Sequence, residues 1–314
     1  MLKRQLGTLF LAICLILIVV PNALCAPSAQ KVTVARDGSG DFNCDGKDDH
    51  VQINQALKFV AEHPECNTVY LKGGTYFIDD TLLIGSNTIL EGDSSATIKL
   101  VSNAGWPAWK PLLKERSSGC HDITISGFTI DGNRDGNKNV GSGNGYYNLI
   151  HLSNCRNVNV NNMYLTNNQG DGVKLEKCSN VKLYNNKIYL LGHDGFYIIT
   201  CSNVEAYKNT ITCRSNSGIR VYNSNHVKIH NNYITSEGSG GAGIQIQRYR
   251  NVLMDDIEVY DNTIYKTRTY GIWVYAEGSC SSTGRVYLHD NTITATRAIV
   301  ASGLKVVQSH NVVK

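Results

Sequence analysis

Two Asp-Gly pairs in the middle of the chain combine residue types that can move protons. Asp171 and Asp194 lie 23 residues apart, and His193 directly precedes the second Asp. Carboxyl and imidazole side chains are the usual general acids and bases of enzymes, and neighbouring groups can tune their pKa values. Because turns alone also favour Asp-Gly, an ordinary turn explains either pair equally well when it is taken singly.

Apolar and polar residues alternate in the segment after each pair, which is typical of a strand with one buried face. If Leu152, Leu175, Ile198 and their counterparts point inward, the residues on either side point outward and form two rows. The first row contains His151, Lys174, Tyr197, Arg220, Gln245 and Trp273. The second row contains Ser153, Glu176, Ile199, Tyr222, Gln247 and Tyr275.

The two rows indicate a surface that binds an acidic sugar polymer. Aromatic residues exposed in register usually bind a ligand, and their rings can stack on sugar rings. Lys174 and Arg220 can pair with uronate carboxylates. A strand face that is merely solvated is the alternative. The expected substrate-binding residues are His151, Glu176, Tyr222, Gln245, Trp273 and Tyr275.

An internal repeat must position these residues. Cys155, Cys178 and Cys201 are spaced 23 residues apart, and Ser224 continues the period. Repeats of this length form solenoids, propellers or arrays, and units of about three short strands without helical periodicity favour a parallel β-solenoid. With rungs ~4.8 Å apart, the rows form a groove roughly 20–25 Å long, which holds several sugar units.

Two further repeat positions have structural explanations. Asn recurs just past a strand, where stacked amides can bond one another and the bent backbone; these residues are Asn186, Asn209, Asn232, Asn262 and Asn291. The Cys residues at the 23-residue spacing are expected to stack as small buried hydrophobic groups. Eight Cys follow residue 26, which permits disulfides but does not determine their pairing.

The amino terminus has the pattern of a secretory signal. Lys3 and Arg4 precede an apolar run over residues 9–20 and then small residues. This run is shorter than the ~20 residues of a spanning helix, so we expect cleavage after residue 26 and no stable membrane span afterwards; an uncleaved anchor is the alternative. The mature chain is expected to be secreted or at the cell surface.

Residues 45–49, Asp-Gly-Lys-Asp-Asp, lead into an amphipathic segment that reaches about Val60. This motif and the strands after it resemble the amino-terminal cap of the pectate-lyase-like superfamily of right-handed parallel β-helix proteins. In pattern the resemblance covers residues 31–314. It implies an all-β fold, a single right-handed parallel β-helix. With the signal peptide expected over 1–26, the domains are a cap with a helix over 27–70 and β-helix repeats over 71–314.

The cap also follows from physical chemistry. Asp48 or Asp49 can cap the helix, and Ile53, Leu57 and Val60 would cover the open end of the solenoid, where strands would otherwise be unpaired.

Calcium is the only cofactor for which the sequence offers ligands. Asp131, Asn133 and Asp135 have the spacing that begins an EF-hand loop, but Ser142 stands where such loops carry Glu. The chain has 30 basic and 26 acidic residues, and two of the basic ones lie in the expected signal. This balance does not indicate a nucleic-acid partner. We expect a monomer that binds an acidic polysaccharide or a cell-surface glycan.

Three hypotheses follow, because the superfamily contains lyases, hydrolases, epimerases and non-catalytic adhesins. The first is removal of the C5 proton of a uronate, giving β-elimination or C5 epimerisation. Arg220 and Lys174 would neutralise the carboxylate, His193 and Tyr197 would act as base and acid, and His151 is the reserve.

The second hypothesis is a glycoside hydrolase that uses Asp171 and Asp194. Adjacent rungs would place these carboxyl groups ~5 Å apart, near the separation found in retaining enzymes. Ser217 stands where a third Asp of the superfamily's hydrolases is expected. The third hypothesis is a surface protein that binds glycan without turnover.

Overall fold

The computed structural model describes residues 31–137, 147–237, 241–250, 252–278 and 284–314. The expected signal segment and Ser142 lie outside these residues. Within the described residues, no helix is long and apolar enough to cross a membrane.

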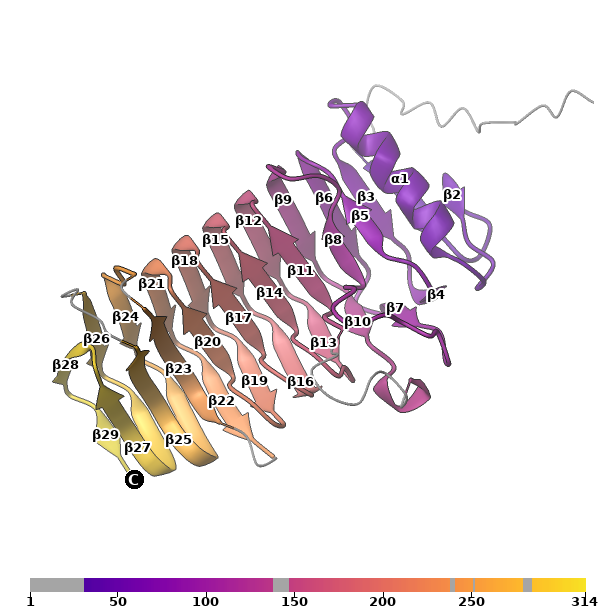
Figure 1. Cartoon of the computed structure of the whole chain (residues 1–314). Coiled ribbons are helices and arrows are strands. Elements are labelled where there is room, and N and C mark those ends of the chain that lie inside the picture. Colours follow the sequence, from indigo (N-terminus) through magenta and orange to yellow (C-terminus); the bar gives the residue numbers. More distant parts are fainter. Residues whose placement is uncertain (1–30, 138–146, 238–240, 251, 279–283) are drawn as a thin grey trace, which may run out of the picture.

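The chain coils into a parallel β-helix whose rungs follow one another along a single axis (Figure 1). The predicted all-β solenoid is therefore confirmed. Each complete coil contributes one strand to each of three faces, and strands of neighbouring coils pair in parallel, as β12 with β15 and β14 with β17. The 23-residue period sets this register, since Val158 pairs with Val181 and Val181 with Val204.

The first face is a sheet of 12 strands. Its strands are β2 (Phe42–Asn43), β1 (Lys31–Ala35), β3 (Thr68–Leu71), β6 (Thr88–Gly92), β9 (His121–Ser126), β12 (Arg156–Asn161), β15 (Ser179–Tyr184), β18 (Ser202–Tyr207), β21 (Asn225–His230), β24 (Ile257–Tyr260), β26 (Arg285–His289) and β28 (Lys305–Ser309).

The other two faces are joined into one sheet by two long strands, β25 (Thr263–Glu277) and β27 (Thr292–Ser302), which take part in both. The second face otherwise contains β4 (Gly74–Ile78), β7 (Ala96–Leu100), β10 (Thr129–Asp131), β13 (Tyr164–Thr166), β16 (Lys187–Leu191), β19 (Thr210–Cys213), β22 (Tyr233–Ser236) and β29 (Val312–Val313). The third face otherwise contains β5 (Leu82–Ile84), β8 (Leu113–Glu115), β11 (Ile150–Ser153), β14 (Val173–Glu176), β17 (Phe196–Ile199), β20 (Ile219–Tyr222) and β23 (Ala242–Tyr249). A short 3-10 helix, η1 (Arg134–Gly136), follows β10.

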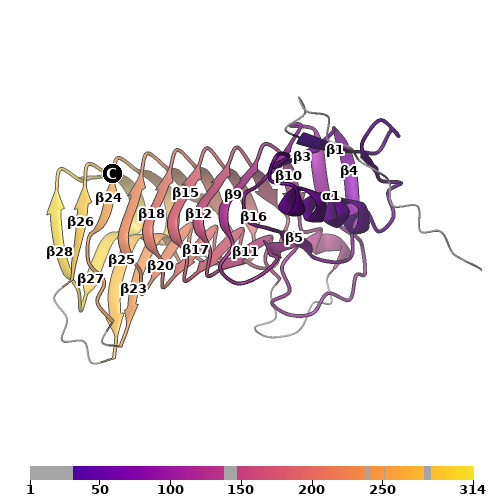
Figure 2. The same cartoon turned by 90° about the horizontal axis from the view of Figure 1, so that it is seen from above.

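Helix α1 (His50–Glu62) lies across the amino-terminal end of the coil (Figure 2). Ile53, Leu57 and Val60 are buried against the first strands, as predicted. The role predicted for Asp49 needs correction. Asp49 stands at the N-cap position, but its side chain makes no capping bond to the helix; it accepts hydrogen bonds from the backbone N–H groups of Gly46 and Phe77, both at 2.8 Å. The buried carboxylate therefore ties the start of the helix to β4.

The predicted stacking of Asn side chains is confirmed, and we call this set the Asn ladder: Asn186, Asn209, Asn232, Asn262 and Asn291. The Asn209 amide is typical. Its Nδ2 donates to the Leu183 carbonyl and to Asn232 Oδ1, both at 2.9 Å, and its Oδ1 accepts from the backbone N–H of Asn186 at 2.9 Å. These bonds satisfy backbone groups that the bend between the first and second faces leaves unpaired.

The Cys residues at the 23-residue spacing are buried, as expected. Cys155, Cys178 and Cys201 are each 2% exposed, and the backbone N–H of Cys178 donates to Cys201 Sγ at 3.3 Å. Cys44, Cys66 and Cys120 are also buried.

Replacing Asn209 by Ala should lower the free energy of unfolding by about 3 kcal/mol, because buried partners on two rungs lose their hydrogen bonds. Chemical denaturation followed by circular dichroism would measure this loss. Lys182→Ala, an exposed change on β15, is the control and should have little effect. Equal stability of the two variants would contradict the structural role of the Asn ladder.

Candidate functional site

The two rows predicted from the sequence lie in register on the third face. His151 pairs with Lys174, Lys174 with Tyr197, and Tyr197 with Arg220. The first row continues through Gln245 to Trp273, and the second row continues through Gln247 to Tyr275. Residues from across the chain thus form lines along the axis of the coil.

A second line of side chains occupies the bend that leads into the third face. We call it the turn ladder: Asn148, Asp171, Asp194 and Ser217. Asn148 Oδ1 accepts from the backbone N–H of Asp171 at 2.9 Å, Asp171 Oδ1 from that of Asp194 at 3.0 Å, and Asp194 Oδ1 from that of Ser217 at 2.9 Å. Asp171 and Asp194 therefore hold equivalent positions, as predicted, and each has a structural role.

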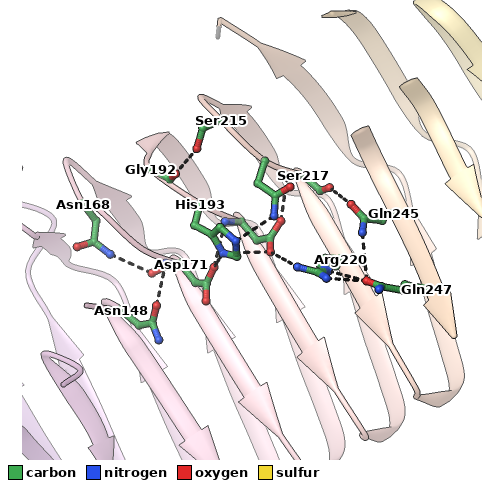
Figure 3. A network of polar contacts seen from close by, with 12 residues as sticks. Asn148, Asn168, Asp171, Gly192, His193, Ser215, Ser217, Arg220, Gln245 and Gln247 are labelled. Carbon is green, nitrogen blue, oxygen red and sulfur yellow. Dashed lines mark hydrogen bonds and ion pairs between the residues drawn. The ribbon is translucent and has the colours of Figure 1, made fainter. Parts of the chain in front are cut away.

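The turn ladder alone does not require carboxylates, since the Asn148 amide makes the same bond. Two adjacent buried Asp residues repel each other when both are ionised, and this costs stability. His193 lies against both of them, with Nδ1 2.6 Å from Asp171 Oδ1 and 3.3 Å from Asp194 Oδ2 (Figure 3). The imidazole offsets the repulsion and is itself fixed in orientation.

Arg220 supplies the second cation of this site. Its Nη1 lies 3.7 Å from Asp194 Oδ2, and its Nη2 and Nε donate to Gln247 Oε1 at 2.6 and 3.2 Å. The guanidinium also stacks on the Tyr197 ring, with its carbon 4.6 Å from the ring centroid. We call Asp171, His193, Asp194 and Arg220 the His193 cluster.

The environment shifts the protonation of this cluster. Burial lowers the pKa of His193, but the hydrogen bond to Asp171 and the charges of both Asp residues outweigh it, so the pKa lies above its ordinary value. Burial raises the pKa of Asp194 to about 7, with the Asp171 carboxylate contributing and the charges of His193 and Arg220 opposing. Burial likewise raises the pKa of Tyr197 to about 12, although Arg220 opposes it.

Only part of the cluster can touch a ligand. The side chains of Asp171 and Asp194 are 2% and 0% exposed, whereas those of His193 and Arg220 are 23% and 18% exposed. The second hypothesis required both carboxyl groups to meet a sugar, and the structure instead places them beneath His193. They can orient the imidazole and stabilise its charge, as the buried Asp does in a Ser-His-Asp triad.

The remaining predicted residues surround the cluster along the groove. Lys174 lies with its Nζ 5.6 Å from the centroid of the Trp109 ring. His151 Nε2 lies 3.9 Å from Glu176 Oε2, and burial together with Lys174 lowers the pKa of His151.

On the other side of the cluster, the Trp273 and Tyr275 rings stack with centroids 4.1 Å apart. The Tyr222 ring lies 6.0 Å from the Arg220 guanidinium carbon. Gln245 was expected to point into the groove, but it is only 4% exposed, because it donates to the Tyr275 hydroxyl and accepts from Ser217 Oγ. It therefore supports the site from beneath.

The sequence analysis did not identify two contributors to the site. Asn216 Nδ2 lies 3.1 Å from His193 Nε2, and Gln247 holds Arg220. The signal for Asn216 was its position 23 residues after His193. Gln247 stood in the second row without an assigned role.

The predicted calcium ligands are not brought together. Asp131 Oδ2 lies 3.1 Å from Lys99 Nζ, whereas Asn133 Nδ2 donates to the Leu100 carbonyl at 2.8 Å. Asp135 is exposed beside Arg134, 3.6 Å from its Nε. The side chains are thus engaged with separate partners.

Two clusters in the described residues could offer metal ligands. Asp171, His193 and Asp194 each place one ligand atom within 4.8 Å of the others, as do Asp48, His50 and Asp79 at the start of α1. In the first cluster, the hydrogen bond from His193 and the adjacent Arg220 already balance the carboxylates, which makes the set a poor match for a cation.

The sequence of residues 148–313 matches the family described as right handed beta helix region. The chain belongs to this family. The match covers more than half of the chain, including the His193 cluster, and it confirms the handedness predicted for the coil.

Solved structures of β-helix proteins agree with this assignment. The A-module of the mannuronan C-5 epimerase AlgE6 from Azotobacter vinelandii has 20% identity and a TM-score of 0.59 over 83% of this chain and 76% of that one. An exopolygalacturonase from Thermotoga maritima has 12% identity and a TM-score of 0.60 over 84% and 87% of the two chains. An endo-xylogalacturonan hydrolase from Aspergillus tubingensis has 14% identity and a TM-score of 0.57 over 90% and 95%.

At these identities the likeness shows the shared β-helix fold alone. No curated protein matches the sequence.

The raised pKa values of His193 and Asp194 predict how stability depends on pH. Both groups hold a proton more tightly in the folded chain than their ordinary values of 6.5 and 3.8 allow. The stability they contribute is complete below those values and is lost as the pH rises through the higher folded values. The free energy of unfolding should therefore fall by about 1–3 kcal/mol between pH 5 and 8.

Asp194→Asn should remove most of this fall, because the amide can still accept from Ser217 but carries no charge. Denaturant titrations at several pH values would measure the slope. Asp256→Asn is the matched control, since Asp256 is an exposed partner of His226. An unchanged slope in Asp194→Asn would contradict the assignment.

Asp171→Asn should lower the pKa of His193 below its ordinary value of 6.5. Burial lowers this pKa, and the variant removes the Asp171 charge that raises it. Nuclear magnetic resonance titration of labelled His side chains would measure the shift, with Asp256→Asn again as the control. If the pKa of His193 stays raised in Asp171→Asn, Asp171 is not the residue that stabilises the protonated imidazole.

Proposed function

We propose that this protein acts on an acidic, uronate-containing polysaccharide by removing the proton at C5, as a lyase or a C5-epimerase. The observation that carries the proposal is the position of His193. It is partly exposed, lies against the buried pair Asp171 and Asp194, and stands beside the anchored guanidinium of Arg220. This arrangement suits proton transfer next to a carboxylate better than it suits carboxyl chemistry on a sugar ring.

The reaction needs the substrate carboxylate to be neutralised, because removal of the C5 proton places negative charge on that group. Arg220 and Lys174 would supply the positive charge from the first row. Arg220 is well suited because Gln247 and Tyr197 hold its planar group in one orientation, so little reorganisation is needed when charge develops.

His193 would be the base. Its Nδ1 faces Asp171 and Asp194, so Nε2 is the nitrogen that would receive the proton, in place of its present contact with the Asn216 amide at 3.1 Å. The two acids would stabilise the imidazolium that forms. Because its pKa is raised, activity should increase as the pH rises through that value and frees Nε2.

Tyr197 would be the acid. Its ring lies 6.3 Å from the His193 ring, and its raised pKa keeps the hydroxyl protonated at neutral pH. In a lyase, the C4–O bond would break as the C4–C5 double bond forms, and the hydroxyl would protonate the leaving oxygen. In an epimerase, it would return a proton to C5 from the opposite face.

The comparisons support a sugar polymer as the substrate without choosing the reaction. One similar structure is a mannuronan C-5 epimerase, and two others are a polygalacturonase and a xylogalacturonan hydrolase. The burial of Asp171 and Asp194 favours proton abstraction over hydrolysis. The signal-like amino terminus supports a site of action outside the cell.

The test is to incubate residues 27–314 with a panel of acidic polysaccharides in D₂O. A lyase would produce absorbance near 232 nm, and an epimerase would introduce deuterium at C5, detected by nuclear magnetic resonance. His193→Gln and Arg220→Gln should each reduce the rate at least about 100-fold, because general base and charge stabilisation are lost. Lys182→Ala on the first face should retain full activity.

Two outcomes would overturn the proposal. New reducing ends without absorbance or C5 deuterium would establish a hydrolase. Binding with unchanged polymer mass and no exchange at C5 would establish a non-catalytic glycan-binding protein.

A further inference from the structure

The groove continues beyond the residues identified from the sequence, toward the amino-terminal end of the coil. A cavity of about 650 Å³ lies there between β5, β8 and the loop that connects β7 to β8. Its polar and aromatic lining includes Trp109, Lys114 and Arg116. Asn54 of α1 also lines it.

The strand register joins this cavity to the candidate active site. Lys114 of β8 pairs with His151 of β11, which in turn pairs with Lys174 of β14. Lys114 is therefore one more member of the first row. Arg220 stands four rungs farther along, roughly 19 Å away at the usual strand spacing.

The charges in this part of the groove are available to a ligand. Lys114 is exposed and has no ion-pair partner among the described residues, and Lys174 contacts the Trp109 ring without an acidic partner. The neighbouring Lys110 differs, because its Nζ lies 2.8 Å from Asp80 Oδ1. Lys114 and Lys174 thus line the row on one side of the His193 cluster, each without an ion-pair partner among the described residues.

Trp109 adds an apolar face to these cations. The residue is 48% exposed, and its backbone φ of 63° is unusual for a bulky side chain. The exposed ring lies beside Lys174, and together they present a flat surface and a positive charge. A pyranose ring that carries a carboxylate matches this combination, since its ring can stack while its acid group pairs with a cation.

We propose that Trp109 and Lys114 form a distal subsite for a second uronate of the polymer whose C5 proton is removed at His193. This inference rests on the proposed function, because it takes the occupant of the groove to be that polymer. The subsite would bind a sugar several units away from the reacting one. Short oligomers centred on His193 would not reach Lys114, whereas longer ones would.

The experiment compares short and long oligouronates, trimers and decamers, as substrates of three variants. Lys114→Ala should raise KM for decamers about 3- to 5-fold, as expected for one partly exposed ion pair, and Trp109→Ala about 10-fold. The kcat values and the KM for trimers should not change. Lys182→Ala removes the same charge from the first face and is the matched control.

A binding measurement separates this inference from the proposed reaction. In affinity electrophoresis through gels containing polygalacturonate or alginate, Lys114→Ala should lose more retardation than Lys182→Ala at low salt, and the difference should shrink at high salt. This holds even if no turnover is found. Equal effects of Lys114→Ala and Lys182→Ala, or equal changes in KM for trimers and decamers, would overturn the distal subsite.

Discussion

Each coil of the chain is joined to the next by parallel backbone hydrogen bonds in fixed register, and this constraint decides which side chains can meet. Residues 23 positions apart are neighbours in the middle coils, as Lys174 and Tyr197 are. A line of functional groups is therefore produced by repetition rather than by bringing distant loops together. The spacing along that line is fixed by the backbone and cannot be adjusted by side-chain movement.

In the His193 cluster, the fixed register places two buried acidic side chains next to each other, which proteins usually avoid. The bend into the third face needs only a neutral acceptor, which the Asn148 amide shows can be provided without an acid. Asp171 and Asp194 supply two acids at adjacent rungs, and the charges of His193 and Arg220 offset their repulsion. The two acids raise the pKa of His193 above its ordinary value, and the imidazole remains partly exposed.

The features that followed the period could be predicted from the sequence. The register of Lys174, Tyr197 and Arg220 and the burial of the Asn ladder both follow from the alternation of apolar residues and the 23-residue spacing. The period also placed Asp171 and Asp194 at equivalent positions, but it did not reveal that both are buried against His193.

The features that depart from the period could not be predicted. Trp109 lies in the connection between β7 and β8, outside the 23-residue repeats, so its contact with Lys174 has no sequence signature. The burial of Gln245 depends on a hydrogen bond to the Tyr275 hydroxyl on the next rung. The Asp49 side chain accepts from the backbone N–H of Phe77 instead of capping the helix. In each case a specific pairing outweighed the tendency of the residue type.

The Asn ladder also has a consequence for how such a protein can change over evolution. Because every Asn in it bonds to the same atoms of the next coil, a coil duplicated or deleted as a whole finds its hydrogen-bond partners ready on both sides. The gain or loss of a single residue within a strand instead turns the later side chains of that strand to the opposite face. The groove can thus lengthen or shorten by whole coils, and the number of coils sets the length of polymer that the protein can contact.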